Sequence, residues 1–251
     1  MKSSGKKSED RRAELLVEIG CEEIPAGMLP RAEEELRSGV EKLLAAENMA
    51  DGVTIEAFSA PRRLTAWVRG LKTKQADIVS EITGPPKSVA YDAVGAPTRA
   101  AVSFAEKQGV ALHDLYLVQT AKGDYIAAKQ IKRGRSTEQI LLDILPRIIH
   151  DIYWPKTMTW TGLAGARFIR PVRWLVGIFD GKPLKFQFAS LAGGAETCGH
   201  RFLGASKIRV KDFEDYEKKL RANGVIVRAS ARREKVEKEL SVLAKKGGYK
   251  V

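Results

Sequence analysis

The sequence predicts an α+β fold in which mixed or antiparallel sheets pack against helices. Short apolar runs rich in Leu, Val and Ile are typical of strands, and they occur along the chain together with amphipathic stretches at helical spacing. Strands and helices are interspersed without a regular strand–helix–strand rhythm, which argues against a parallel α/β sheet. With 251 residues, 44% of them hydrophobic, the chain can bury a sizeable core.

The first third of the chain is expected to hold a strand, a helix and two further strands. An apolar run predicts a strand over residues 14–20, and apolar positions at helical spacing predict a helix over 28–47. Residues 53–58 predict the second strand. Alternation of apolar and polar residues over 64–69 predicts a third strand with one face in the core and the other in solvent.

The middle of the chain is expected to hold a short helix and a hairpin. Glycine and two prolines at 84–86 interrupt the preceding pattern. Thr98 is placed to cap a helix that Gly109 ends. Residues 115–120 and 125–131 predict a hairpin joined by a Lys-Gly-Asp turn.

A longer amphipathic helix and an apolar strand follow. Ser136 opens the helix, and Gln139 completes a capping box. Pro146 is expected to kink or end that helix, because proline lacks a backbone N–H. Residues 172–179 predict a strongly apolar strand, turned into a second strand at 184–188.

The last stretch differs in composition from about Ala205 onward. Two charged helical patterns, at 212–222 and 230–246, flank a short expected strand at 225–227. The predicted organisation is a disordered basic tail over residues 1–12, an α+β domain over 13–204, and the start of a second charged module over 205–251, which ends without a closing element.

The charge balance indicates a polyanionic partner. Lys and Arg number 43 against 31 Asp and Glu, a net charge of +12, and a basic surface gains free energy by releasing counterions from phosphates. A purely solubilising role is the alternative. No apolar run approaches the ~20 residues that span a bilayer, so no membrane association is expected. Two distant cysteines without a CxxC motif favour a reducing cytoplasm.

Familiar catalytic motifs are missing from the sequence. It has no phosphate loop ending in Gly-Lys-Ser/Thr, no GxSxG and no HExxH, and its three histidines cannot form a His-rich metal site. We therefore predict no catalytic residue and no metal site in this chain. Glu22 and Glu23 could serve acid–base chemistry, but the favoured interpretation is that they stabilise the N-terminus of the next helix.

A basic stretch with interleaved aromatics is the candidate RNA-binding region. Residues 155–175 contain no acidic residue. Guanidinium groups bind phosphate oxygens, and exposed aromatics stack on unpaired bases. Trp174 and Phe179 are instead expected in the core. Strand alternation predicts that Arg170 and Arg173 point to opposite faces.

A second arginine pair follows Pro61, which stiffens the approach to it. The alternative is that these arginines cap a strand end and bridge to nearby carboxylates. The candidate RNA-binding residues are Arg62, Arg63, Lys156, Arg167, Arg170, Arg173, His200 and Arg201.

Seven segments stand in a fixed order along almost the whole chain after the tail. They are LLVEIGCEEIPAGML (15–29), APRRL (60–64), GPP with PTRAAVSFAEKQG (84–86 and 97–109), KGDY (122–125), WPKTMTW (154–160), RFIRPVRWL (167–175) and GHRFLG (199–204). In order and spacing the chain resembles the N-terminal part of the β subunit of bacterial heterotetrameric glycyl-tRNA synthetases. It departs from the family at Cys21, where threonine is usual, and at Thr159, where arginine is usual.

The resemblance implies an ATP-dependent class II ligase with an α2β2 assembly. Its α subunit forms glycyl-adenylate from ATP with magnesium, and its β subunit binds tRNA(Gly). The resemblance also implies a fold similar to the B3/B4 domain of the phenylalanyl-tRNA synthetase β subunit, and a complete β subunit that continues beyond Val251. By itself this chain is then expected to bind no cofactor and to be inactive.

Two other readings of the sequence remain open. One is a free-standing RNA-binding or editing module without a synthetase partner, and the other is a subunit scaffold. Editing is not expected, because glycine is the smallest amino acid and a tight pocket excludes every competitor sterically.

Overall fold

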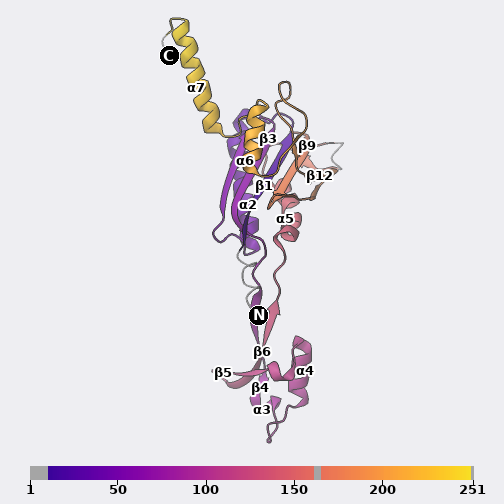
Figure 1. Ribbon diagram of the computed structural model, residues 1–251. Coiled ribbons are helices and arrows are strands. Elements are labelled where there is room, and N and C mark those ends of the chain that lie inside the picture. The colour runs from indigo at the N-terminus through magenta and orange to yellow at the C-terminus, as the bar shows by residue number, and fades with distance from the viewer. Residues whose placement is uncertain (1–10, 161–164, 250–251) are drawn as a thin grey trace. The chain divides into compact units, whose positions relative to one another are not determined.

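The computed structural model describes residues 11–160 and 165–249 and has the predicted α+β class. Its contacts divide the chain into two compact units (Figure 1). One unit is Ala76–Arg135, here called the inserted unit. The other comprises residues 11–75 and 136–249 of the described chain, and we call it the sheet unit.

The sheet unit is built on a seven-stranded sheet that combines distant parts of the chain. Its strand order is β11-β12-β9-β1-β3-β2, and β10 pairs with β9. All neighbours are antiparallel except β12 and β9, which run parallel. The strands are β1 (Arg12–Cys21), β2 (Thr54–Ala60), β3 (Arg63–Lys72), β9 (Val172–Phe179), β10 (Lys182–Pro183), β11 (Gln187–Phe188) and β12 (Leu191–Gly194).

Two helices cover one face of this sheet, as Figure 1 shows. Helix α2 (Leu29–Ala46), preceded by the short helix η1 (Ala26–Met28), and helix α5 (Thr137–Asp151) pack side by side. The apolar positions of α2 recur at helical spacing, so one stripe of the helix is buried against the strands. The expected bounds of this first helix are confirmed to within one residue at each end.

The other face of the sheet is covered by the C-terminal part of the unit. Helix α6 (Phe213–Ala222) packs Phe213, Tyr216 and Leu220 onto β1, β2 and β9. The expectation that the third strand has a solvent face is therefore wrong. Thr65 is fully buried, and the Trp67 ring stacks on Phe213 at 4.2 Å between centroids.

The remaining elements of the sheet unit are short or exposed. Strands β7 (Met158–Thr159) and β8 (Arg167–Phe168) pair with each other, as do β13 (Glu196–Thr197) and β14 (Ile208–Arg209). The strand expected at 225–227 does not form, since these residues are an irregular segment that buries Val227. Helix α7 (Ala229–Lys246) buries only Ala244.

The domain boundary expected near Ala205 stays a prediction. The structure shows that Ile208, Val210 and Val227 share a hydrophobic cluster with α6 and the strands. Residues 1–10, within the expected basic tail, lie outside the described residues. In the described part of the chain, no helix is both long and apolar enough to cross a membrane.

The inserted unit is a small antiparallel sheet with helices on it. Its strand order is β4-β6-β5, and its buried hydrophobic cluster consists of Ala90, Ala101 and Ile126. The hairpin of β5 and β6 confirms the expected one. The elements are β4 (Ile78–Pro86), α3 (Lys87–Ala90), α4 (Arg99–Gln108), η2 (Leu112–Asp114), β5 (Tyr116–Thr120) and β6 (Gly123–Lys132).

The inserted unit leaves and rejoins the sheet unit at one place. Lys74 and Ser136 form an antiparallel bridge. The Thr137 N–H donates to the carbonyl of Thr73 at 3.1 Å, and its hydroxyl donates to the carbonyl of Lys72 at 2.5 Å. The two crossing points of the chain are therefore paired side by side.

Local signals at helix ends are confirmed at Ser136 and Gly109. The Ser136 hydroxyl accepts from the Gln139 N–H at 3.3 Å, and Gly109 ends α4 with a φ of 67°, a left-handed conformation that favours glycine. Thr98 stands before α4 but does not cap it, because its hydroxyl donates to the Val89 carbonyl.

Both proline signals lie within elements of the structure. Strand β4 continues through residues 84–86 to Pro86, and a register shift after Thr83 accommodates the prolines. Pro146 lies inside α5 and does not end it, since the helix continues to Asp151, and a kink at this position stays a prediction.

Candidate nucleic-acid interface

The segment after β1 is held between two other loops. The Cys21 N–H donates to the Arg62 carbonyl at 2.9 Å, the Glu22 N–H donates to the Pro171 carbonyl at 3.0 Å, and the Ile24 N–H donates to the Pro61 carbonyl at 2.7 Å. These backbone bonds fix the positions of the Glu22 and Glu23 carboxylates at one end of the sheet.

Four predicted arginines converge on Glu22 and Glu23. The Glu22 carboxylate lies 3.3 Å from Arg62, 3.4 Å from Arg173 and 3.2 Å from Arg201. Arg201 also lies 3.3 Å from the Glu23 carboxylate, and Arg170 donates to the Glu23 carbonyl at 2.9 Å. We call these six residues the arginine cluster.

The favoured interpretation of Glu22 and Glu23 is therefore wrong. Their carboxylates contact arginines, and the first turn of α2 contains no acidic residue. The pKa of Glu23 is held below its ordinary value. The main cause is a hydrogen bond from the backbone of Glu23 itself, and a hydrogen bond from Arg201 adds to it. Glu23 is therefore charged at neutral pH and neutralises part of the surrounding positive charge.

Arg170 and Arg173 meet the same acidic segment, so the expectation of opposite faces is wrong. Strand alternation does not apply to Arg170, because β9 begins only at Val172. Both side chains are exposed. The expected core positions of Trp174 and Phe179 are confirmed, since both belong to the packed clusters of the sheet.

Arg63 lies apart from its neighbour, in the interior. Its side chain is 3% exposed, its Nη1 is 3.0 Å from Glu18, and its Nη2 donates to the Cys198 carbonyl at 2.7 Å. The alternative for this arginine pair, bridging to nearby carboxylates, is confirmed at both positions. Burial raises the pKa of the Tyr216 hydroxyl, and the negative charge of Glu18 raises it further. This hydroxyl therefore stays protonated.

A close approach of backbone and indole supports this end of the sheet. Gly20 pairs with Trp174 across β1 and β9, and a Cβ at Gly20 would overlap the Trp174 ring. The guanidinium groups of Arg62 and Arg63 lie 5.7 and 5.6 Å from that ring. Sequence reasoning missed Gly20, because nothing in its neighbours indicates which side chain crosses over it.

The loop at residues 199–204 is closed by Asn223. The His200 N–H donates to the Asn223 carbonyl at 2.8 Å, and the Ala205 N–H donates to its side-chain oxygen at 2.9 Å. Side chains at Gly199 and Gly204 would collide with Asn223. The glycines at both ends of the GHRFLG segment therefore permit this tight closure.

The same loop fixes His200 and exposes its apolar tip. His200 Nδ1 accepts from the N–H groups of Phe202 at 3.2 Å and Leu203 at 3.3 Å, which assigns the ring proton of the neutral imidazole to Nε2. The side chains of Phe202 and Leu203 are 83% and 79% exposed. Phe202 is a candidate that the residue-type search missed, although it stands beside two predicted residues.

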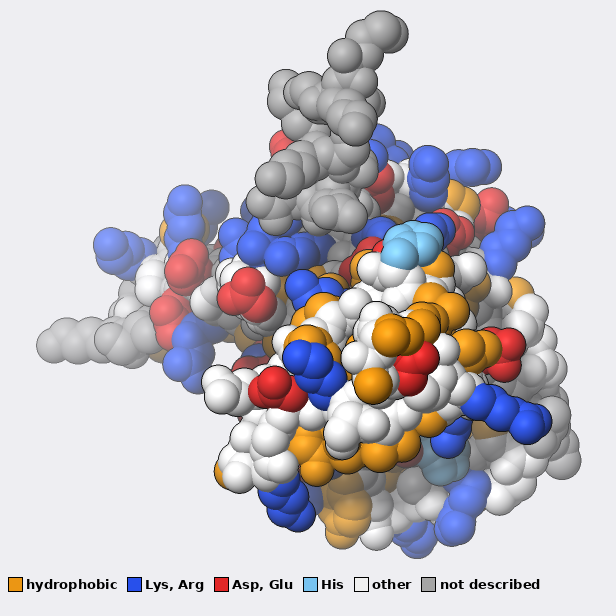
Figure 2. Space-filling model, turned by 90° about the horizontal axis from the view of Figure 1, so that it is seen from below, with side chains coloured by type: hydrophobic (Ala, Val, Ile, Leu, Met, Phe, Trp, Pro, Cys, Tyr) orange, Lys and Arg blue, Asp and Glu red, His pale blue; other side chains and the backbone are white. Residues whose placement is uncertain are grey.

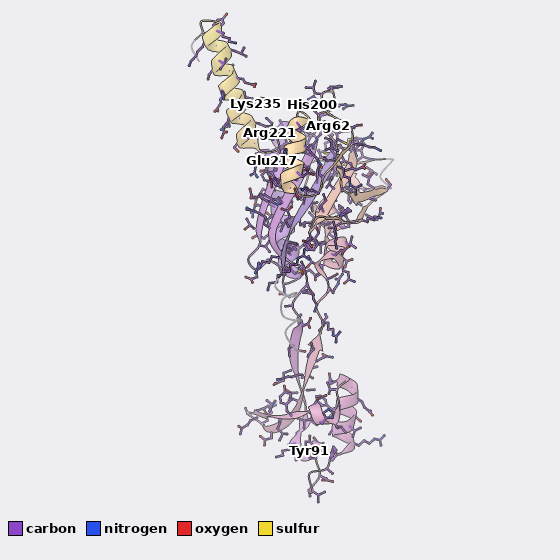
Figure 3. The ribbon with its side chains drawn as sticks, in the orientation of Figure 1. Arg62, Tyr91, His200, Glu217, Arg221 and Lys235 are labelled. Carbon is purple, nitrogen blue, oxygen red and sulfur yellow. The ribbon has the colours of Figure 1, made fainter. Side chains whose placement is uncertain are left out.

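Two hollows adjoin the arginine cluster. One, of about 280 Å³, is lined by residues that include Pro61, Arg62, His200, Ile226 and Arg232. A second, of about 400 Å³, lies between Arg62, Arg173 and the segment from Glu196 to Lys207. Figure 3 shows Arg62 and His200 at the same end of the sheet unit.

Lys156 and Arg167 are not part of this arrangement. Lys156 precedes β7, Arg167 lies in β8, and both are exposed. Among the described residues, neither contacts Glu22 or Glu23. Figure 2 shows lysine and arginine side chains interspersed with acidic side chains in the view from below.

The described residues offer no set of three or more His, Cys, Asp and Glu side chains placed to hold a metal ion. Burial raises the pKa of Cys21 from 9.0 to about 12 and also raises the pKa of Cys198, which keeps both thiols protonated at neutral pH. What this end of the sheet unit provides chemically is a set of fixed guanidinium groups around hollows of moderate size.

The chain matches known proteins over nearly its whole length. Residues 15–251 match the family described as glycyl-tRNA synthetase beta subunit. The chain is 41% identical to a "Glycine--tRNA ligase beta subunit" of Anaeromyxobacter dehalogenans, covering 95% of this chain and 34% of the relative. It is 40% identical to the β subunit of Geobacter metallireducens, covering 94% of this chain and 34% of the relative. It is 41% identical to that of Acidobacterium capsulatum, covering 91% of this chain and 32% of the relative. The chain thus spans about a third of the length of these curated relatives.

Proposed function

Because the chain belongs to the family of glycyl-tRNA synthetase β subunits, we propose that it binds tRNA(Gly) and contributes to subunit assembly in a glycine–tRNA ligase. It does so next to an α subunit in an α2β2 enzyme of the cytoplasm. The adenylate site lies on the α subunit, which uses ATP with magnesium, and this chain binds neither. The names of the relatives support this role over a free-standing RNA-binding or editing module.

The observation that carries tRNA binding is the charge surplus of the arginine cluster. Four arginines surround two carboxylates, so the cluster keeps a net positive charge after pairing. The side chains of Arg173 and Arg201 are 60% and 48% exposed. Exposed ion pairs of this kind are weak, so phosphate oxygens can compete for the same guanidinium groups.

We propose a smaller set of residues for phosphate contact, chosen by exposure of the side chain. Arg170, Arg173 and Arg201 are exposed, and Arg62 is partly so. Arg63 is buried against Glu18, so we assign it to the interior of the protein and not to the RNA surface. Lys156 and Arg167 stay separate, exposed candidates, and His200 stays a candidate beside Arg201.

The salt dependence of tRNA binding tests the proposal. Each phosphate contact steepens the fall of log affinity with log salt by roughly 0.7–0.9. Arg173→Gln and Arg201→Gln should each reduce that slope by about one such step, with little change in preference among tRNA sequences. Arg37→Gln is the matched control, because Arg37 is also exposed and also pairs with two carboxylates.

If both cluster variants and the control keep the parent slope while remaining folded, RNA binds elsewhere. A second experiment tests the division of labour between the subunits. The pure chain should show only background pyrophosphate exchange with glycine and ATP, and exchange that persists after removal of any α subunit would contradict the proposal.

A further inference from the structure

We propose that the loop at residues 199–204, together with the hollow beside it, receives one unpaired nucleotide of a single-stranded RNA segment. We call this loop and hollow the Phe202 site. The inference rests on the proposed tRNA binding and adds which kind of RNA is bound and which residue holds its base.

The exposed Phe202 ring provides a surface on which a base can stack. It is 83% exposed at the tip of a loop that Asn223 holds in place, so little further ordering is needed on binding. The Arg201 guanidinium lies 5.8 Å from the ring centre and the His200 ring lies 6.2 Å away. Aromatic and guanidinium planes side by side are typical of sites for unpaired bases.

The hollow next to Phe202 has the size and lining that suit a single base. Its volume is about 280 Å³, slightly below the roughly 300–1,000 Å³ of pockets that hold drug-sized ligands. Apolar lining comes from Pro61, Val225 and Ile226. Because Nδ1 of His200 accepts two backbone N–H groups, its Nε2–H remains as a donor for an acceptor on a base edge.

Positive charge at the same hollow suits the phosphate of that nucleotide. Arg62, Arg201 and Arg232 line it together with one carboxylate, that of Glu23, so the lining keeps a positive surplus. Arg232 Nη1 donates to the backbone carbonyls of Ile226 and Val227 at 2.8 and 2.7 Å, contacts that orient its guanidinium without neutralising it. The Nε of Arg62 is buried, makes no hydrogen bond among the described residues and lies 3.6 Å from a carboxylate oxygen of Glu23.

These features favour single strands over duplexes. In a duplex the bases are already stacked and paired, so none is free to stack on Phe202 or to enter the hollow. A positive surface without an exposed aromatic would bind both forms through their phosphates alone. Preference for single-stranded RNA is therefore the property that distinguishes the Phe202 site from general charge attraction.

The test compares one RNA sequence in single-stranded and duplex forms. The probe is a short oligonucleotide carrying 2-aminopurine, titrated with the 251-residue chain by fluorescence. Phe202→Ala should weaken single-strand binding by about 5- to 150-fold, the range that corresponds to 1–3 kcal/mol for stacking of one base. Duplex binding and the salt slope should not change, because no charge is removed.

Two further variants make the result specific. Phe202→Trp should retain binding, whereas Phe202→Leu, which keeps apolar bulk without an aromatic face, should lose most of it. Tyr249→Ala removes another exposed aromatic residue, 76% exposed, and should bind like the parent. Unchanged tryptophan fluorescence of the non-tryptophan variants shows that the sheet unit is folded.

Each other outcome overturns the inference in a recognisable way. If the parent binds single-stranded and duplex RNA equally, and Phe202→Ala binds both with the same affinity and the same salt slope as the parent, the Phe202 site is wrong. The proposed function then still stands. If the parent binds no RNA at any salt concentration, the proposed tRNA binding fails as well. If Phe202→Ala weakens capture of the α subunit but not of RNA, the loop is a protein-docking surface.

Discussion

The sheet unit and the inserted unit support their folds in different ways. The sheet unit buries apolar residues on both faces of its sheet and also encloses an ion pair between Glu18 and Arg63. The inserted unit has a buried cluster of two alanines and one isoleucine. The large core therefore accommodates a buried charge pair, whereas the small one combines Ile126 with the partly buried side chains of Tyr91, Phe104 and Leu115.

The largest effect should come from breaking the buried ion pair. Arg63→Met leaves the Glu18 carboxylate buried without its cation, which should lower the free energy of unfolding of the sheet unit by about 3–5 kcal/mol. Urea denaturation followed by tryptophan fluorescence measures this unit alone, because all four tryptophans lie in it.

Two controls accompany that variant. Arg69→Met removes an exposed arginine from the same strand and should change stability by less than about 0.5 kcal/mol. The double variant Glu18→Leu with Arg63→Met should regain most of the loss, since a buried pair often exchanges for apolar residues with little cost. A single variant as stable as the parent would show that the pair is not buried in solution.

A smaller but more localised loss is expected in the inserted unit. Ile126→Ala removes its one large buried side chain, at a cost of about 2–5 kcal/mol. A unit of this length holds only a few kcal/mol in total, at roughly 0.05–0.15 kcal/mol per residue. Hydrogen exchange in residues 78–132 should accelerate strongly, while the tryptophan transition stays unchanged.

The exposed residue Ile131, on the same strand, provides the control for this variant. Its side chain is 62% exposed, so Ile131→Ala should leave exchange in the inserted unit near that of the parent. If Ile126→Ala also shifts the tryptophan transition, the two units unfold together and the comparison between them fails.

Alkaline pH should distinguish the units through Cys21. Burial raises the pKa of this thiol from 9.0 to about 12. Its contribution to stability is therefore complete below pH 9 and is lost as pH rises toward 12, at ~1.4 kcal/mol per pH unit for one linked proton. Urea midpoints from tryptophan fluorescence at pH 8 and pH 10.5 measure the loss.

Cys21→Val should reduce that pH dependence by one proton, because it removes the titrating group and keeps an apolar side chain. Both cysteines lie in the sheet unit, so the inserted unit has no thiol to contribute. An unchanged slope in the variant would mean that other groups, such as Tyr216, account for the alkaline loss.

The smallest effect concerns a single backbone angle in the inserted unit. Gly109 has a φ of 67° with open space around it, so Gly109→Ala costs only the strain of a left-handed alanine, about 1 kcal/mol. Faster hydrogen exchange in α4 is the measurement. Gly27→Ala, in the sheet unit, also meets no neighbour and lacks a positive φ, so it should be neutral.

The spacing of apolar and polar residues along the sequence predicted those helices and strands whose bounds are set by neighbouring residues. The bounds of α2, β9 and the β5–β6 hairpin follow from residue spacing, and the Ser136 cap follows from residue type. The segmentation into two units was missed, because it depends on which distant strands pair. Strand β4 was missed for a local reason, since its prolines fall where a register shift removes the need for ladder hydrogen bonds.

The candidate site was predicted in its residue types but not in its geometry. Arg62, Arg170, Arg173 and Arg201 come from separate segments, and no spacing rule indicates that they meet two glutamates. The burial of Arg63 depends on α6, which lies more than a hundred residues away along the chain. The sequence shows that Phe202 stands next to Arg201, but the exposure of its side chain is a property of the folded loop.

The paired crossing points at Lys74 and Ser136 make the insertion replaceable. Because these residues are bridged and Thr137 is hydrogen bonded to Thr73, a tight turn of a few residues could join the segment after β3 to helix α5 where Ala76–Arg135 now departs. The sheet would keep every strand and its register. The order and register of the strands that carry the arginines therefore do not depend on this segment.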